Sequence, residues 1–185
     1  ISDPGYKLIK TALDENIVVK SVPGPSALTA AISISGISSD QFIFLGFLPK
    51  KPSLRKNKIN SISHIEASII IFETAPRLNK LLKDLYLFLG NRNVSILREI
   101  TKMYEENIRG NLIDVIENYE NRKLKGELVL LIEKSKYTDD QIRDMLKEKL
   151  PNLGISKASK EIAKKTFIKS DYIYKLALSI NNTSN

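Results

Sequence analysis

The chain has 185 residues and a mass of 20.9 kDa, which at about 150 residues per domain allows one ordinary domain and a small appendage. Hydrophobic residues make up 42% and charged residues 27% of the sequence, a balance that excludes both a disordered chain and a membrane protein. The 29 Lys and Arg against 21 Asp and Glu give a formal charge of +8, which favours a polyanionic partner such as nucleic acid, although the Lys-rich codon usage of an AT-rich genome would raise the charge too.

The sequence contains no cysteine and a single histidine, His64. Without cysteine, disulfides, thiolate metal sites and cysteine nucleophiles are excluded, and the composition fits a reducing compartment. One histidine excludes a His-rich metal site, so we expect no bound metal. No segment approaches the roughly 20 apolar residues of a membrane span, and the first residues do not resemble a signal peptide. We therefore expect a soluble, cytoplasmic protein without a membrane partner.

The first 36 residues are predicted to form a helix, a strand and a second helix. An Asp-Pro pair at positions 3–4 is typical of a helix start, and helical spacing continues to about residue 16. The β-branched run over 17–22 predicts a short strand, which the following Pro-Gly-Pro turn ends. Ser26 is the predicted cap of the next helix, and Gly36 is its predicted end.

The next segment predicts two strands and a long helix. Residues 41–47 (QFIFLGF) predict a strand, 49–58 (PKKPSLRKNK) a basic loop and 60–66 a short helix. Residues 67–73 (ASIIIFE) form a continuous apolar run, which is typical of a buried strand in a sheet covered on both faces. A leucine stripe over 78–90 predicts a helix closed by its last residue, a glycine.

The second half of the chain changes character after residue 134. Residues 94–99 and 127–133 predict strands, and 111–120 predict a helix, so strands alternate with helices as in an α/β layer fold. Polar and charged residues follow, with three short helices and no strand-like run. We therefore expect two domains, an α/β subdomain over 1–135 and a small helical module over 136–185 that could bind RNA.

No stand-alone catalytic motif such as a P-loop, GxGxxG, GxSxG or HExxH is present. Three predicted strand-end loops, 22–27, 72–77 and 98–102, are the candidate ligand-binding segments. In an open α/β sheet, ligands bind beyond the carboxyl ends of the strands, where backbone amides and helix N-termini are free.

Six motifs follow one another in an order that resembles a known family. They are ISDPG at 1–5, PGPSAL at 23–28, GFLP at 46–49, FETAPRL at 72–78, REITK at 98–102 with EE at 105–106 and RG at 109–110, and GELVLLIE at 126–133. Together they resemble the ribosomal RNA small subunit methyltransferase I family, the cytidine 2′-O-methyltransferases of the tetrapyrrole methylase fold. The resemblance covers essentially the whole chain.

The resemblance implies an α/β fold with a mixed sheet of about five strands and flanking helices. It also implies S-adenosyl-L-methionine as the cofactor, a cytidine ribose of small-subunit (16S) rRNA as the substrate, and a homodimer. Family members possess an additional N-terminal α/β domain, with the cofactor in the cleft between the domains. We therefore expect this chain to be the C-terminal part of the enzyme, to hold half of the cofactor site and to be inactive by itself.

Site residues are carried over by motif. The residues expected to contact the cofactor are Asp3, Gly5, Ser26, Ala27, Glu73, Thr74, Ala75, Gly126 and Glu127. Many family members carry a His where this chain has Pro76, so carboxylates are the expected proton acceptors, and Glu73 and Glu99 are the candidate catalytic residues. Without the resemblance, Glu73 is interpreted as a surface glutamate and the charges from Arg98 to Glu106 as a solvated run.

Five basic residues without an intervening acid form the predicted RNA-binding segment: Lys50, Lys51, Arg55, Lys56 and Lys58. The alternative is a solvated surface loop, in which case the Lys-rich helical module is the other candidate for RNA. Two further functions stay open at this point. A noncatalytic RNA-binding module would carry out no methyl transfer, and a tetrapyrrole methylase would have no need of an extended basic surface.

Overall fold

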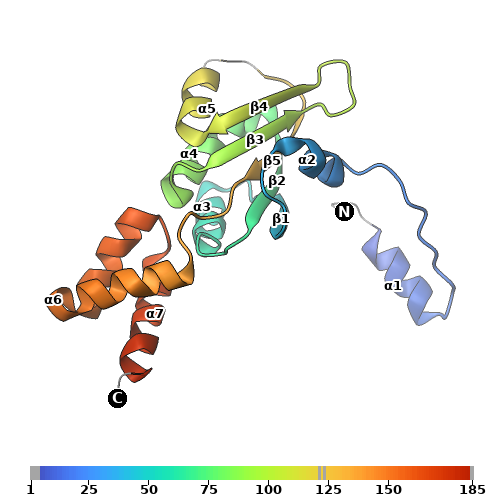
Figure 1. Ribbon diagram of the computed structural model, residues 1–185. Helices are drawn as coiled ribbons and strands as arrows, with labels where there is room; N and C mark the ends of the chain where they lie inside the picture. The colour runs from blue at the N-terminus through green and yellow to red at the C-terminus, as the bar shows by residue number, and fades with distance from the viewer. Residues whose placement is uncertain (1–4, 121, 123, 184–185) are drawn as a thin grey trace.

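A mixed five-stranded sheet in the order β1-β2-β5-β3-β4 forms the centre of the molecule (Figure 1). The computed structural model describes residues 5–120, 122 and 124–183. β1 and β2 are parallel, β5 runs antiparallel to both β2 and β3, and β4 is antiparallel to β3. The strands are β1 (Phe42–Phe47), β2 (Ser68–Thr74), β3 (Asn93–Arg98), β4 (Glu106–Asn111) and β5 (Glu127–Ile132).

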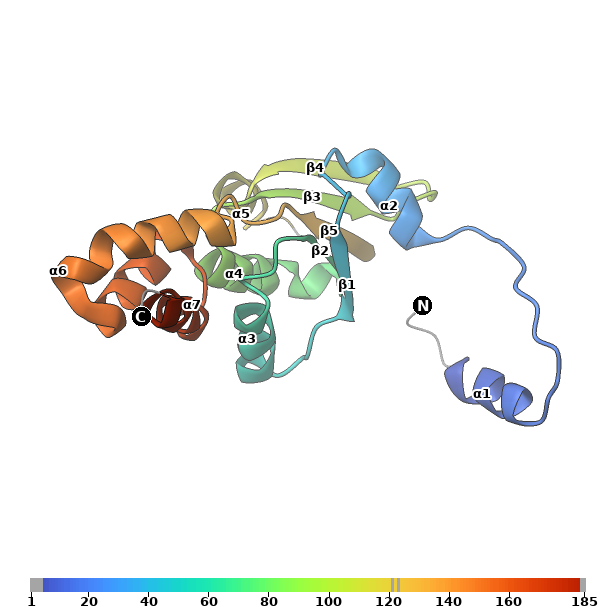
Figure 2. The ribbon, with the colours of Figure 1, turned by 60° about the horizontal axis from the view of Figure 1, so that its bottom comes forward.

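Both faces of the sheet are covered, as the apolar run of β2 predicts. Successive side chains of a strand point to opposite faces, so Ile69 and Ile71 pack into one apolar core and Ile70 into another. Figure 2 shows α2 on one side of the sheet and α3 and α4 on the other. The covering helices are α2 (Ala27–Ser35), α3 (Pro52–Ser61), α4 (Leu78–Leu89) and α5 (Leu112–Tyr119).

The helical module consists of α6 (Asp139–Thr166) and α7 (Ser170–Thr183). Its apolar core is separate from those of the sheet and includes Ile142, Ile162 and Ile173. Gly154 has non-helical backbone angles and divides α6 in two, so the three predicted helical pieces are present. Among the described residues, no helix combines the length and apolar character needed to cross a membrane.

The strand predicted over 17–22 is wrong. These residues have no regular secondary structure, and the preceding α1 (Tyr6–Asp14) buries no residue and stands away from the sheet (Figures 1 and 2). A strand needs a neighbour to take up its N–H and C=O groups, and none lies beside 17–22 in the part of the chain that the structure describes. The fifth strand is instead β4, whose sequence ENIRGN has too few apolar residues to predict a strand.

The basic loop predicted over 49–58 and the helix predicted over 60–66 are also wrong. Helix α3 begins at Pro52, whose fixed φ and missing N–H suit the first turn of a helix. It ends at Ser61, and its buried side chains are Arg55 and Ile59. The proline that indicated a loop thus marks the start of a helix.

Candidate active site

One cavity lies where the three candidate loops meet, at one edge of the sheet. The carboxyl ends of β1, β2 and β3 share this edge, and antiparallel β5 begins there, since Thr74 faces Glu127. The cavity has a volume of 340 Å³, which lies within the roughly 300–1,000 Å³ of ligand pockets. Its lining includes Ala27, Phe47, Glu73, Glu99, Lys102 and Glu127.

Glu73, the last residue but one of β2, is a buried carboxylate with 1% of its surface exposed. The Thr74 N–H donates to Oε1 at 2.9 Å, and Nε of Arg77 lies 3.2 Å from the same oxygen. Oε2 is buried and has no hydrogen-bond partner among the described residues. Burial raises the pKa of Glu73, while the Thr74 N–H and Arg77 oppose that rise. A buried acceptor without a partner is costly, so Oε2 is a polar atom that the described residues leave unsatisfied.

Arg77 connects this carboxylate to the segment that follows β1. Its Nη2 donates to the Leu48 carbonyl at 2.9 Å, while its Nε faces Glu73. Arg77 belongs to the short 3₁₀ helix η1 (Ala75–Arg77), which the fixed φ of Pro76 favours. Pro76 itself is exposed and has no group that could accept a proton. The guanidinium therefore fixes both the Glu73 side chain and the GFLP segment at the cavity.

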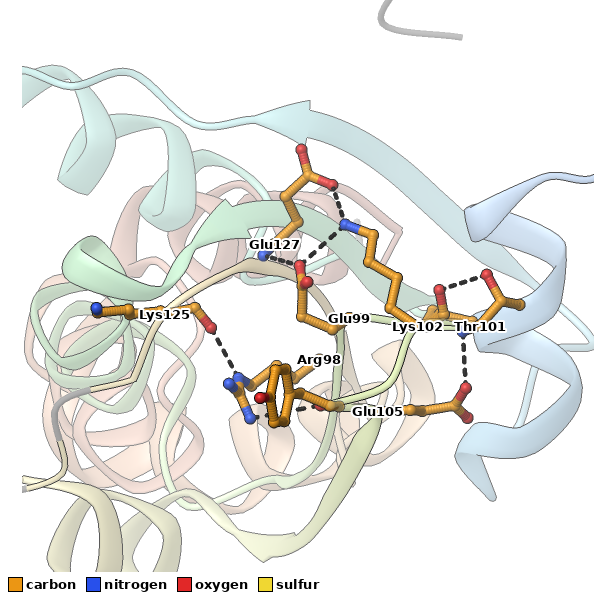
Figure 3. Close-up of polar contacts among 9 residues, drawn as sticks. Arg98, Glu99, Thr101, Lys102, Glu105, Lys125 and Glu127 are labelled. Atoms are coloured by element: carbon orange, nitrogen blue, oxygen red, sulfur yellow. Dashed lines mark hydrogen bonds and ion pairs between the residues drawn. The ribbon is translucent and has the colours of Figure 1, made fainter.

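The loop after β3 is held in a fixed shape by its own side chains (Figure 3). Glu99 and Thr101 have φ values of 50° and 65°, in the left-handed region that non-glycine residues rarely adopt. The Thr101 N–H donates to the Glu105 carboxylate at 2.7 Å, and Nε of Arg98 donates to the Lys125 carbonyl at 2.7 Å. Such strained conformations persist where surrounding contacts determine them, and they cluster at functional sites.

Glu99 differs from Glu73 because its side chain is partly exposed, although it too has a backbone N–H and a cation as partners (Figure 3). The Glu127 N–H donates to Oε1 at 2.9 Å, and Nζ of Lys102 lies 3.0 Å from the same oxygen. The Glu127 N–H and then Lys102 lower the pKa of Glu99. A Cβ at Gly126 would lie 2.6 Å from the Glu99 side chain, so only glycine permits this approach. Two carboxylates of one cavity thus have pKa values shifted in opposite directions, a pattern that separates acid–base roles.

Residues 1–116 match the family model described as Tetrapyrrole (Corrin/Porphyrin) Methylases. The chain belongs to this family. The mixed five-stranded sheet with flanking helices agrees with the membership. Among solved structures, a cobalamin biosynthetic enzyme, cobalt precorrin-4 methyltransferase, has a TM-score of 0.54 at 14% identity over 70% of this chain and 58% of its own. A conserved hypothetical protein from Aeropyrum pernix K1 has a TM-score of 0.51 at 11% identity over 76% and 56%. These two likenesses show the fold.

Curated relatives of this tetrapyrrole methylase family member carry the name ribosomal RNA small subunit methyltransferase I. The one from Synechocystis sp. is 35% identical over an alignment of 188 positions, which covers 97% of this chain and 67% of the relative. Those from Halalkalibacterium halodurans and Rickettsia prowazekii are 41% and 43% identical over 133 residues, with 46% and 47% of their own lengths covered. The chain spans about half to two thirds of the length of these relatives, from 46% to 67%.

The cavity brings together four of the predicted site residues of this family member: Ala27, Glu73, Glu99 and Glu127. The predicted residues Ser26, Thr74, Ala75 and Gly126 lie one or two positions along the chain from these but do not line the cavity, and the Ala75 N–H donates to the Gly126 carbonyl at 3.1 Å. Gly5 precedes α1, which stands away from the sheet, and Asp3 lies outside the described residues. Sequence reasoning assigns no role to Arg77 and considers Lys102 only as one of the charges between Arg98 and Glu106, although both lie in the candidate loops.

The predicted RNA-binding segment needs one correction, at Arg55. This side chain is buried, and its Nε donates to Oδ2 of the buried Asp84 at 2.7 Å. Arg55 is therefore engaged inside the fold and is not available to a phosphate. Nζ of Lys56 lies 3.8 Å from the other oxygen of the same carboxylate. The exposed members of the segment are Lys50, Lys51 and Lys58.

Proposed function

We propose that this chain forms the catalytic part of an S-adenosylmethionine-dependent methyltransferase that acts on the 2′-hydroxyl of a cytidine in small-subunit rRNA. The observation that carries the proposal is the buried Glu73, which is among the residues that line a cavity formed by the family's loops and whose Oε2 has no hydrogen-bond partner among the described residues. The names of the relatives and the formal charge of +8 support RNA as the substrate.

The residues at the cavity fit S-adenosylmethionine, which carries a cationic sulfonium and a flat adenine. The lining includes apolar side chains such as Phe47. Its charged residues are one cation, Lys102, and three carboxylates, those of Glu73, Glu99 and Glu127. We place the cofactor on Ser26, Ala27, Glu73, Thr74, Ala75, Gly126 and Glu127. When bound, it supplies a methyl group already activated for transfer. The protein then has to position the acceptor oxygen and remove its proton.

Glu73 is the residue we assign to that proton. Its Oε2 accepts a hydrogen bond from the ribose hydroxyl, which orients the oxygen, and then takes the proton as the new bond forms. A raised pKa suits this role because a more basic carboxylate holds the transferred proton better. Glu99, with its lowered pKa, stays ionised and holds Lys102 and the start of β5 in place.

Further parts of the proposal concern the assembly and the surroundings of the enzyme. We propose that Lys50, Lys51 and Lys58 contact the RNA backbone, that the enzyme is a cytoplasmic homodimer, and that residues 1–135 and 136–185 are separate domains. The exposure of the three lysines and the separate apolar core of α6 and α7 support the first and last of these.

Methyl transfer by the full gene product that contains these residues tests the reaction. Small-subunit rRNA is incubated with S-adenosylmethionine, digested to nucleosides and analysed by mass spectrometry. A ribose-methylated cytidine supports the proposal. A methyl group on the base, or transfer only to a tetrapyrrole, would contradict it. RNA binding with no transfer at all would identify a noncatalytic RNA-binding module instead.

A further inference from the structure

A second cavity shares no lining residue with the first and lies between α4 and the turn that joins α6 to α7. It is a groove of 540 Å³. Leu87 and Phe88 of α4 form one wall, Lys164 of α6 and Phe167 form the other, and Asn60 at the end of α3 reaches it as well. The carboxylate in its lining, Asp171, is 3.2 Å from Nζ of Lys169 and so is paired.

Phe167 presents an aromatic surface to this groove. It follows the last turn of α6 with a left-handed φ of 58°, a position that glycine usually takes. Its ring packs on the backbone of Gly90, where an added Cβ would lie 2.7 Å from ring atom Cδ2. The residue is nevertheless 40% exposed, and the neighbouring Leu87 is 56% exposed. A ring supported on one side and open on the other is a platform for a flat, apolar group such as a nucleobase.

Three lysines lead along α6 to the groove. Lys157, Lys160 and Lys164 are spaced three and four residues apart, so they share one side of the helix. All three are exposed, and none forms an ion pair within the described residues. The one acidic residue among them, Glu161, is paired with Lys149. The helix dipole favours cations in the last turn, which accounts for Lys164 but not for Lys157 two turns earlier.

We propose that this groove binds an unpaired nucleotide of RNA, with its base against Phe167 and its backbone on Lys164, Lys160 and Lys157. Uncompensated positive charge beside an exposed aromatic ring is the combination that binds single strands. Helix α3 connects the groove to the active site. Phe47 lines the first cavity, and Lys50 and Lys51 follow it just before α3 begins. Asn60, near the end of α3, lines the second cavity. Ten helical residues span about 15 Å. The choice of RNA as the ligand rests on the proposed function.

The test measures RNA binding by the full gene product without a methyl donor. The probe is a fluorescein-labelled single-stranded RNA of about 12 nucleotides, within the site sizes of single-strand binders, followed by fluorescence anisotropy. We expect Phe167→Ala to weaken binding roughly 5- to 100-fold, the range of one lost base stack. Phe167→Tyr keeps the ring and should bind almost as well as the wild type, whereas Phe167→Leu keeps apolar bulk only and should bind as poorly as the alanine variant.

Charge is tested separately from stacking. The double variant Lys160→Ala with Lys164→Ala should make the negative slope of log K against log salt shallower by about 1.4, because each phosphate contact on a single strand contributes about −0.7. The matched control is Lys7→Ala with Lys20→Ala, which removes the same charge from the exposed N-terminal segment and should leave the slope nearly unchanged. Circular dichroism of each variant shows whether it is folded.

Each outcome decides the inference independently of the reaction. If Phe167→Ala and the double lysine variant are folded and bind RNA as the wild type does, the groove is not an RNA site, whether or not methyl transfer occurs. If Phe167→Leu binds as well as Phe167→Tyr, base stacking on the ring is wrong. A dimer in sedimentation that Phe167→Ala dissociates, with RNA affinity unchanged, would assign the groove to a second copy of the chain. If RNA binding by the variants behaves as expected but no methyl transfer occurs, the assignment of the groove as an RNA site stands and the proposed reaction is overturned.

Discussion

The end of β2 and the loop after β3 each place one glutamate at the same cavity, yet the two carboxylates differ in how deeply they are buried. Glu73 has 1% of its surface exposed, and one of its oxygens has no partner among the described residues. Glu99 is partly exposed in a strained loop, where Lys102 and the Glu127 N–H contact one of its oxygens. Both carboxylates have a backbone N–H and a cation on one oxygen, so burial is what separates them: it raises the pKa of Glu73, whereas the partners of the partly exposed Glu99 lower the pKa of that carboxyl.

The largest effect is expected when the buried carboxylate loses its ability to take a proton. Glu73→Gln preserves shape and should lower the single-turnover rate of methyl transfer by roughly 10² to 10⁴, the usual contribution of a general base. Glu117→Gln, an exposed residue of α5, removes the same charge and is the matched control. Full activity of the Glu73→Gln enzyme would make Glu73 structural and Glu99 the next candidate base.

A second large effect is expected when Glu73 loses its cation. Arg77→Met removes the partner of a buried carboxylate and should destabilise the fold at neutral pH by about 2 kcal/mol, below the usual 3–5 kcal/mol because Arg77 is partly exposed. The loss should depend on pH. Burial already raises the pKa of Glu73 above the ordinary 4.5, so the folded state binds its proton more tightly than the unfolded state does, and stability falls as pH rises through the folded pKa.

Urea unfolding of Arg77→Met at several pH values checks this. The cost should be small near pH 4.5, where a protonated Glu73 needs no cation, and should grow toward neutral pH. In a Glu73→Gln background the same substitution should cost less, because no charge is left unpaired. A cost that is equal at every pH and in both backgrounds would show that Arg77 acts only through the Leu48 carbonyl.

An effect of similar size is expected at the glycine that packs against Glu99. Gly126 has a φ of 102°, and a Cβ there would overlap the Glu99 side chain, so Gly126→Ala should cost about 1–3 kcal/mol and displace the carboxylate from the Glu127 N–H. Gly24→Ala is the control, because a Cβ at Gly24 has no neighbour within 4 Å. Urea unfolding measures both. Equal stability of the two variants would show that the loop after β3 adjusts freely.

The sequence predicts the sheet best where the strands are long and apolar. The runs that form β2 and β5 predict these strands almost to the residue because both of their faces are buried. The rule that ligands bind at the carboxyl ends of strands assigns Glu73 and Glu99 to one site, and both line the same cavity. By contrast, β4 is an edge strand with a polar sequence, and no pattern indicates it.

Other features depend on partners that are distant in the sequence. Arg55 belongs to a basic segment that is typical of an RNA-binding loop, but Asp84, 29 residues later, makes it part of the core. That Oε2 of Glu73 has no partner in the described part of the chain results from three-dimensional packing, so residue type and spacing cannot show it. The apolar run over 17–22 has the composition of a strand, yet a strand forms only where another lies beside it.

The smallest effect is expected at Lys102, the exposed counterpart of Arg77. Lys102→Met removes the cation that lies 3.0 Å from Glu99 and 3.2 Å from Glu127, but Glu99 still accepts the Glu127 N–H. Because Lys102 is exposed and an exposed ion pair contributes little, the urea midpoint should hardly change. Any small difference from the wild type should vanish in about 1 M salt, where the Debye length is only about 3 Å. The pKa of Glu99 should rise toward its ordinary value, which carboxyl NMR titration can follow. If Lys102→Met instead destabilises the fold as much as Arg77→Met does, burial is not what separates the two glutamates.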